Sequence, residues 1–323
     1  MTGDDPATLA PDLVVVGDCN PDVLVLGGDL TPAFGQQEKL VDSMSLVVGG
    51  SAAITAVAAA RLGLRVALVA AVGVDPAGAF MLGQLASEGI DTTAVAVRAG
   101  APTGMTVALS RGEDRAILTA TGAITTLTAA DVPAALLARA RHLHVSSYFL
   151  LERSLGPGLR ELFAAAHAAG LTTSLDTNWD PSGRWGDGLL RAALGQTDLL
   201  LPNQAEALAI SGEQTLPGAM TALTAAGTAV VVKLGARGAL CADGPRRCRA
   251  EPPPVTPVDT TGAGDCFNAG LLAGLRRGLE LPQAAALGCA VGAASTRAAG
   301  GTGSCPDLPT ALLMAEAVTV RLG

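Results

Sequence analysis

Short apolar runs alternate with longer alanine-rich runs along most of the chain. Leu13–Val16, Val66–Ala71 and Ala229–Val232 are continuous apolar stretches, as is typical of strands that are buried on both faces of a parallel sheet. Ala52–Leu62 and the segment 282–297 are rich in alanine and indicate close-packed helices. Alternating strands and helices predict an α/β fold, with a mostly parallel central sheet and helices on both of its faces.

Two segments break this alternation, at about residues 23–48 and 95–120. Both contain short runs of alternating polarity separated by turn residues, which favours β-hairpins over further helices. We expect these two segments to form a small β-sheet lid over the end of the first strand.

Polar residues follow the first strand directly. The turn after Val16 contains Asn20 and Asp22. Ligands of open α/β sheets bind at the carboxyl ends of the strands, so both side chains are placed to hydrogen-bond a polyol. An ordinary Asx-rich turn would explain the same two residues, and the spacing alone favours that turn.

A second polar stretch, VDTTGAGDCFNAG, begins at Val258 and runs into a helix of small residues. Gly262 and Gly264 allow the backbone to approach a ligand closely. The first amides of the helix lack intrahelical acceptors and, with the helix dipole, favour an anion such as phosphate. Asp265 could cap the helix or accept the proton of a hydroxyl that attacks a phosphoryl group, and its position is compatible with both roles.

Composition narrows the class of protein. The 323 residues are 49% hydrophobic and only 15% charged, which is enough apolar surface for a sizeable core. The net charge of −8 argues against nucleic acid or an anionic membrane as a partner. The six cysteines include no CxxC pair, so we expect free thiols. The polar, acidic N-terminus and the lack of a long uninterrupted apolar run favour a cytoplasmic protein.

The DTTGAGD stretch and the small-residue helix after it resemble the signature of the ribokinase (PfkB) family of carbohydrate kinases. The resemblance implies a ribokinase-like three-layer sandwich, with residues 1–323 forming a single kinase domain and its lid. It implies that Asp265 is the catalytic base. It also implies that the amides of Gly262, Ala263 and Gly264 bind the transferring phosphate.

The substrate half of the family pattern is matched with two departures. The pair Gly49-Gly50 before an alanine-rich helix resembles the family's first glycine signature. The resemblance therefore implies a sugar site made by the residues Asn20, Asp22, Gly49, Gly50 and Asp265. Ile54 stands where the family usually has Asn, and Trp179 stands where relatives usually have Arg, which puts the identity of the sugar in doubt.

The nucleotide half is matched by an NxxE element and a lysine-glycine loop. The resemblance implies that Asn203 and Glu206 organise Mg²⁺ through water, although the same pair also fits a helix capping box. It further implies a nucleotide loop made by the residues Lys233, Gly235 and Gly238, together with Gly262 and Gly264. A monovalent cation such as K⁺ is left open, with the candidate ligands Asp259 and Thr261.

These features predict ATP- and Mg²⁺-dependent phosphorylation of a sugar or sugar-like alcohol. Two alternatives remain, a nucleoside kinase of the same family and a sensor of sugars or nucleotides without catalysis. The resemblance also leaves open a homodimer formed through the lid.

Overall fold

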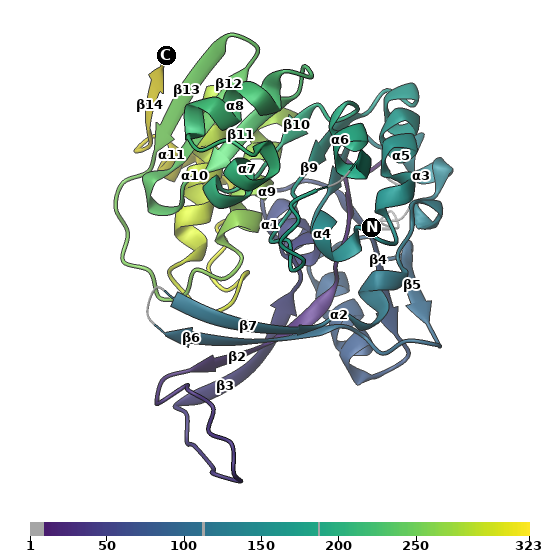
Figure 1. Cartoon of the computed structure of the whole chain (residues 1–323), viewed down its shortest axis with the longest axis vertical. Helices are drawn as coiled ribbons and strands as arrows, with labels where there is room; N and C mark the ends of the chain where they lie inside the picture. Colours follow the sequence, from purple (N-terminus) through teal and green to yellow (C-terminus); the bar gives the residue numbers. More distant parts are fainter. Residues whose placement is uncertain (1–9, 112–113, 187) are drawn as a thin grey trace, which may run out of the picture.

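A ten-stranded sheet crosses the molecule in the computed structural model, which describes residues 10–111, 114–186 and 188–323 (Figure 1). Its order is β14-β13-β12-β11-β10-β9-β8-β1-β4-β5, and the strands from β11 to β5 run parallel. The strands are β1 (Leu13–Val16), β4 (Val66–Gly73), β5 (Val95–Arg98), β8 (His142–Val145), β9 (Thr172–Leu175), β10 (Leu199–Leu200), β11 (Ala229–Lys233), β12 (Ala239–Asp243), β13 (Arg246–Glu251) and β14 (Thr319–Leu322).

Helices cover both faces of this sheet and enclose two separate apolar cores. Successive residues of β1 belong to different cores, with Leu13 in one and Val14 in the other, as the alternation of side chains along a strand requires. One core includes residues of α1 (Ser51–Arg61), α2 (Pro76–Ser87), α9 (Ala263–Arg276), α10 (Leu281–Ser295) and α11 (Leu308–Ala315). The other includes residues of α3 (Ala134–Leu137), α4 (Tyr148–Leu151), α5 (Gly156–Ala168), α6 (Gly188–Leu194), α7 (Gln204–Ser211) and α8 (Leu216–Thr224). The predicted three-layer α/β fold is confirmed.

A separate four-stranded sheet forms the predicted lid at one end of the molecule (Figure 1). Its strands are β2 (Asn20–Leu26), β3 (Ser43–Gly49), β6 (Met105–Arg111) and β7 (Asp114–Ala120), in the order β3-β2-β6-β7. The first lid strand begins at Asn20, so Asn20 and Asp22 stand on a strand and not in a turn.

The predicted lid segment 95–120 is wrong in its first part. Residues 95–98 form β5, which runs parallel to β4 at the edge of the large sheet. The physical reason is burial, because Val95 packs into one core and Ala96 against the other. The second lid segment therefore begins at Met105, and residues 112–113 of the predicted lid lie outside the described residues.

Close packing against α10 fixes the position of α9. A Cβ atom at Gly270 would lie 2.9 Å from the carbonyl oxygen of Leu287. A Cβ atom at Gly288 would lie 2.9 Å from the carbonyl oxygen of Phe267. Only glycine allows the two backbones to approach so closely, and this approach holds the start of α9 in place.

We expect Gly288→Ala to destabilise the protein by about 1–3 kcal/mol, because the added methyl group meets backbone that cannot move freely. Gly83→Ala is the matched control, since Gly83 lies in α2 and a Cβ there meets no atom within 4 Å. This control should gain about 0.5–1 kcal/mol from helix propensity. Urea denaturation measures both changes, and equal midpoints for the two variants would contradict the packing argument.

Candidate active site

A cavity of about 350 Å³ lies between the lid and the carboxyl ends of the parallel strands. The lid contributes polar and aliphatic side chains, namely Asn20, Asp22, Thr106, Ala108, Ile117 and Thr119. The body contributes most of the charged groups and the glycine loop, namely Asp18, Gly50, Ser51, Ile54, Leu150, Asp176, Asn178, Asn203, Glu206, Lys233, Gly235 and the segment 260–265. A volume of this size suits a small molecule.

Asp265 stands in the first turn of α9 and lines this cavity. Removal from bulk water raises the pKa of its carboxyl group well above the usual value, and the negative charge of Asp176 raises it further. The positive charge of Lys233 acts in the opposite direction. Its raised pKa makes the Asp265 carboxylate a stronger proton acceptor than an exposed aspartate.

The glycine loop before α9 presents backbone amides to the same space. Gly262 is the N-cap and has a left-handed φ of 69°, which turns the chain sharply into the helix. The amide of Ala263 donates to the carbonyl of Thr260 at 3.3 Å, so the amides of Gly264 and Asp265 are better placed to bind a ligand. These amides and the helix dipole form an anion-binding site.

Lys233 adds a positive charge beside this helix N-terminus. Its Nζ atom donates to Oδ2 of Asp176 at 2.6 Å, and it lies 3.5 Å from the position that a Cβ of Gly264 would occupy. The lysine side chain is only 12% exposed, so it is not a solvated strand end. The ion pair holds the ammonium group at the wall of the cavity.

Asp176 also lines the cavity, although it was not among the site residues predicted from the sequence. Although burial acts to raise its pKa, the charge and hydrogen bond of Lys233 keep the pKa of Asp176 below its usual value. Asn268 of α9 also donates to this carboxylate. The signal was present in the polar run directly after the buried strand β9, where Asp176 is the first residue.

Asn203 and Glu206 form the capping box that their spacing predicted. The amide of Asn203 donates to Oε2 of Glu206 at 2.8 Å, and the amide of Glu206 donates to Oδ1 of Asn203 at 3.0 Å. Burial, together with the charge of Asp176, raises the pKa of Glu206 to about 7. Both residues line the cavity, so the capping role and a ligand role are compatible.

The donor set fits Mg²⁺ only through water and phosphate oxygens. No cluster of three or more His, Cys, Asp or Glu residues that could hold a metal occurs in the described ranges. Mg²⁺ retains several waters and takes few protein carboxylates when it arrives with a nucleotide. Glu206 and Asn203 are the residues placed to contact such waters.

Hydrogen bonds connect the polar side chains on the lid side of the cavity. Nδ2 of Asn20 lies 3.1 Å from both Oδ1 of Asp22 and Oγ1 of Thr106. A Cβ at Gly49 would lie 2.0 Å from Oδ1 of Asp22, so Gly49 leaves room for that carboxylate and does not itself line the cavity. Gly50 does line it, as the N-cap of α1 with a φ of 81°.

Asp18 is a second residue that the sequence reasoning missed. Its carboxylate accepts from the amides of Ser51 at 3.1 Å and Ala52 at 3.0 Å, at the start of α1. Burial raises the pKa of Asp18, and its charge is one of the influences that raise the pKa of Asp265. Asp18 therefore shapes the electrostatics of the cavity.

Two predicted residues, Gly238 and Asp259, lie outside the cavity lining. Gly238 lies outside the lining and opens β12, where a Cβ would lie 1.9 Å from the carbonyl oxygen of Ala250. Asp259 also lies outside the lining, and its carboxylate accepts from Thr261 and from the amide of Gly300. Thr261 does line the cavity.

The two departures from the family pattern have different positions. Ile54 lines the cavity and packs under the glycine loop, since a Cβ at Gly262 would lie 3.1 Å from its Cγ2 atom. Trp179 is 58% exposed and outside the lining. Its ring lies edge-on to that of Trp185, with 4.7 Å between the centroids.

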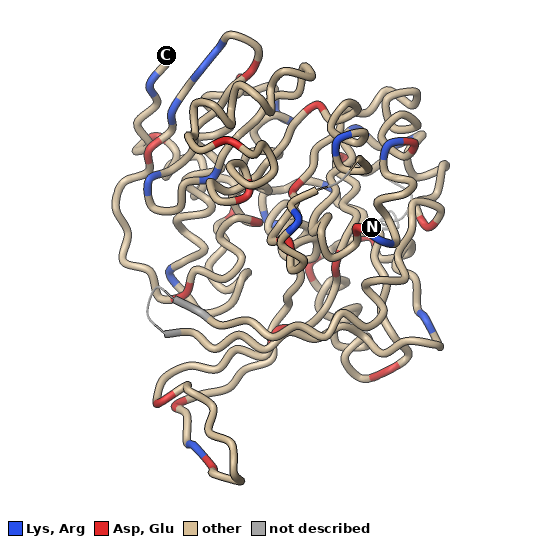
Figure 2. Tube along the Cα trace, in the orientation of Figure 1, with Lys and Arg blue, Asp and Glu red and all other residues tan. Residues whose placement is uncertain are grey.

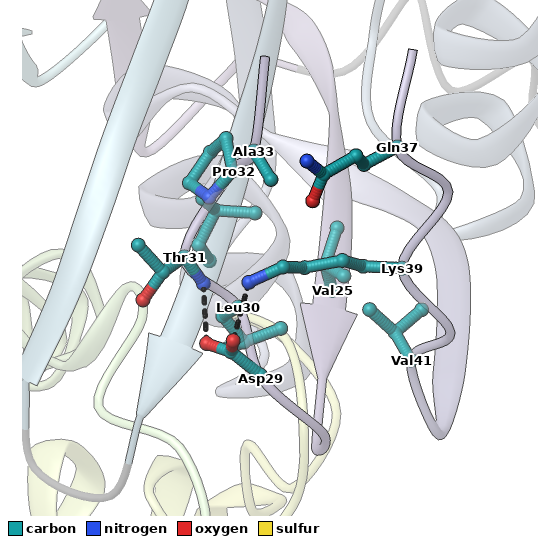
Figure 3. Close-up of a pocket in the computed structure, with 10 residues that line it drawn as sticks. Val25, Asp29, Leu30, Thr31, Pro32, Ala33, Gln37, Lys39 and Val41 are labelled. Atoms are coloured by element: carbon teal, nitrogen blue, oxygen red, sulfur yellow. Dashed lines mark hydrogen bonds and ion pairs between the residues drawn. The ribbon is translucent and has the colours of Figure 1, made fainter. Parts of the chain in front are cut away.

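A second pocket, of about 260 Å³, lies within the lid (Figure 3). It is enclosed by Val25, Leu109 and the loop 29–41. Asp29 forms an ion pair with Lys39 and accepts from the amide of Thr31 at 3.1 Å. This pocket holds none of the predicted site residues, so we place the chemistry in the first cavity.

An acid, a lysine and a helix N-terminus around one cavity are groups suited to phosphoryl transfer. The family model for the pfkB family carbohydrate kinases matches residues 10–308. Fructoselysine 6-kinase of Escherichia coli K12 is 32% identical over 76% of this chain and 88% of its own length. The chain therefore belongs to the PfkB family of carbohydrate kinases.

Solved structures agree with this assignment. Fructokinase of Vibrio cholerae O395, solved with fructose, ADP and a calcium ion, superimposes with a TM-score of 0.78 and is 26% identical, covering 94% of this chain and 99% of its own. A candidate ribokinase II of E. coli, solved with ATP and Mg²⁺, has a TM-score of 0.84 at 23% identity and covers 95% and 99% of the two chains. This second likeness shows the ribokinase-like fold. Across the part of the chain described here, no helix is long and apolar enough to span a membrane.

We predict that Glu206 makes the folded protein less stable as the pH rises from about 5 to 7.5. The pKa of Glu206 is raised to about 7 from 4.5, so the folded state binds a proton that the unfolded state has already lost, and stability falls over that interval. The cost is on the order of 3 kcal/mol. Denaturation at both pH values should show a smaller loss for Glu206→Gln than for the parent protein. Equal losses in the two proteins would contradict the burial argument.

Proposed function

We propose that the protein transfers the γ-phosphate of ATP to a hydroxyl group of a sugar or sugar-like alcohol. The observation that carries the proposal is the position of Asp265. Its carboxyl group shares one cavity with the polar lid residues Asn20 and Asp22 and with the helix N-terminus. Groups suited to a polyol, a proton and a phosphate thus meet in one place.

In the proposed reaction, Asn20 and Asp22 hold hydroxyl groups of the sugar beneath the lid. Asp265 accepts the proton of the attacking hydroxyl as its oxygen bonds to the γ-phosphorus and ADP leaves. The amides of Gly264 and Asp265 and the ammonium of Lys233 stabilise the negative charge on the phosphoryl oxygens. When bound, Mg²⁺ would neutralise phosphate charge and contact Glu206 and Asn203 through water.

A sugar is favoured over a nucleoside by the apolar part of the lining. Ile54, Ile117 and Leu150 are aliphatic, and the lining contains no aromatic side chain among the described residues. Phe34, the one aromatic residue of the lid loop, is 95% exposed and lies outside the cavity. Similarity to a fructoselysine kinase and a fructokinase further supports a ketose or its derivative. We also propose that the protein acts in the cytoplasm, where its proposed co-substrate ATP is available.

We expect Asp265→Asn to lower turnover by several orders of magnitude, because the amide cannot accept the proton. General-base catalysis supplies about 10²–10⁴ of that factor. ADP release would be measured with fructose, fructoselysine, 2-keto-3-deoxygluconate, ribose and adenosine, each in K⁺ and in a bulky-cation buffer. ATP affinity should stay nearly unchanged.

The exposed Asp243 at the end of β12 provides the matched control, and Asp243→Asn should keep full turnover. Normal phosphorylation by Asp265→Asn would contradict the base assignment. If adenosine were the only substrate of the panel to be phosphorylated, the proposed substrate class would be a nucleoside and not a sugar. Stimulation by K⁺ would support a cation site at Asp259 and Thr261, and no stimulation would remove it.

The outer face of the lid sheet is largely apolar, and we propose this face as the interface of a homodimer. Asp22 and Leu24 point to the body, toward the cavity and Gly300 respectively, so the alternate residues point away from it. Strand register places on this outer lid face the residues Val23, Met44, Leu46, Val107, Ala116 and Leu118, whereas Val25 and Leu109 of the same face line the pocket beside the loop 29–41. Met44, Leu46 and Leu118 are 63%, 47% and 65% exposed. Charged residues are sparse along these strands (Figure 2), and a second copy offers the same apolar surface.

Leu118→Lys should convert the dimer to a monomer, because it places a charge at a 65% exposed position of the outer lid face, on the edge strand β7. Light scattering after size exclusion would give 32.0 kDa for this variant and twice that mass for the parent protein. Leu322→Lys is the control, at a 77% exposed position on β14. A monomeric parent protein at micromolar concentration would exclude the interface.

A further inference from the structure

Two thiol groups meet directly behind the catalytic turn. Cys266 follows Asp265 in the first turn of α9, and Cys305 lies in the loop before α11. Their Sγ atoms are 2.8 Å apart, and both cysteines are free. Cys266 is completely buried, whereas Cys305 is half-buried and can be reached from solvent.

The loop that carries Cys305 also touches the anion-binding turn. The Sγ atom of Cys266 donates to the carbonyl oxygen of Gly301 at 3.1 Å. Gly301 packs on the catalytic loop, where a Cβ at Gly262 would lie 2.6 Å from its Cα atom. The amide of Gly300 donates to Asp259 at 2.8 Å. A change in the sulfur–sulfur contact therefore acts on backbone that lies against the phosphate site.

We propose that Cys266 and Cys305 form a reversible disulfide that lowers the activity of the enzyme. The oxidant is a low-molecular-weight disulfide such as glutathione disulfide. The Cys305 thiolate attacks one of its sulfur atoms and expels the first thiolate of the oxidant. The Cys266 thiol then loses its proton and attacks Sγ of Cys305, which expels the second thiolate. Two protein thiols lose two protons and two electrons, and the oxidant leaves as two thiols.

The surroundings of Cys305 favour it as the first nucleophile. The hydrogen bond with Cys266 and the positive charge of Arg61 lower the pKa of the Cys305 thiol. Arg61 is held nearby because its guanidinium group donates to the carbonyl oxygen of Thr302. Lower pKa and greater exposure are the two properties of a reactive cysteine. The same hydrogen bond and burial raise the pKa of Cys266, which suits the second, resolving thiol.

A structural metal does not explain the pair. Two thiolates leave a tetrahedral zinc site two ligands short. Within the ranges that the structure describes, no group of three or more His, Cys, Asp or Glu residues could hold a metal ion. Oxidation to a disulfide needs only the two adjacent thiols and a disulfide oxidant, with no further protein ligand.

The disulfide would disturb the phosphate site through Gly301. A disulfide holds its sulfur atoms about 2.0 Å apart, so the present 2.8 Å contact must shorten. The part of this change that side-chain rotation does not supply moves the loop toward α9. Gly301 already lies against Gly262 with no room for a further atom. Small displacements of catalytic groups cost large factors in rate, and we expect turnover to fall about tenfold or more.

A second cysteine pair provides an internal control. Cys241 and Cys248 stand opposite each other on β12 and β13, and both are buried, at 2% and 6% exposure. This pair lies outside the cavity lining. Cys241→Ser with Cys248→Ser therefore removes two thiols and leaves the proposed switch intact.

The experiment treats the intact, native protein with glutathione disulfide, then counts thiols after denaturation and maps linked peptides by mass spectrometry. Six free thiols should fall by two, with the peptides of Cys266 and Cys305 joined. Turnover with the best sugar of the panel should fall and recover with dithiothreitol. The Cys241→Ser, Cys248→Ser protein should behave in the same way, starting from two fewer thiols.

Cys305→Ser should keep its turnover during oxidation and form no link. Cys266→Ser should stop at a glutathione adduct on Cys305, which keeps the test decisive if either variant alone folds poorly. An unchanged thiol count, or a link confined to Cys241 and Cys248, would overturn the proposal. A link that leaves turnover unchanged would refute the regulatory part. The peptide map does not depend on the proposed kinase reaction, so the two proposals can fail separately.

Discussion

The ion pair between Lys233 and Asp176 is the interaction on which the cavity depends. Five carboxyl groups line the space, from the residues Asp18, Asp22, Asp176, Glu206 and Asp265, and Lys233 is the one basic residue among the described lining residues. Without a cation, these carboxyl groups would repel one another and any phosphate. Burial, and then the charge of Asp176, raise the pKa values of Glu206 and Asp265, and Lys233 offsets this only in part. In the proposed reaction, Mg²⁺ would supply further positive charge for a polyanionic nucleotide.

Features that depend on neighbouring residues could be predicted from the sequence, whereas features that depend on contacts between distant segments could not. The apolar runs predicted buried strands correctly, because a parallel strand is enclosed by its own layer of helices. The glycine turn before Asp265 could be read from sequence, since its function uses adjacent residues. Asp18 and Asp176 were missed because each looks like an ordinary turn residue until the sheet brings it beside Asp265. The pairing of β5 with β4 is likewise a non-local choice.

The alternation of polar and apolar residues along the lid strands did not show which residues face the cavity. Both faces of the lid sheet carry apolar residues, so its strands appear mixed when read along the chain. Register separates the two faces, with Asp22 and Thr106 opposite each other on the inner face and Val23 and Val107 together on the outer one. Register depends on partner strands, and it determines which side chains meet the substrate.

Close contacts between glycine residues behind the cavity fix the position of the glycine turn and also couple it to the neighbouring loop. Ile54 packs against Gly262 and Gly301, at a position where the family usually has a polar residue that contacts sugar. In this chain the Ile54 side chain supports the glycine turn, and the proposed sugar contacts come mainly from the lid residues Asn20 and Asp22. Because Gly301 and Gly262 touch without side chains between them, movement of one loop is passed directly to the phosphate site. The same tight packing that fixes the amides therefore makes them sensitive to chemistry at Cys305.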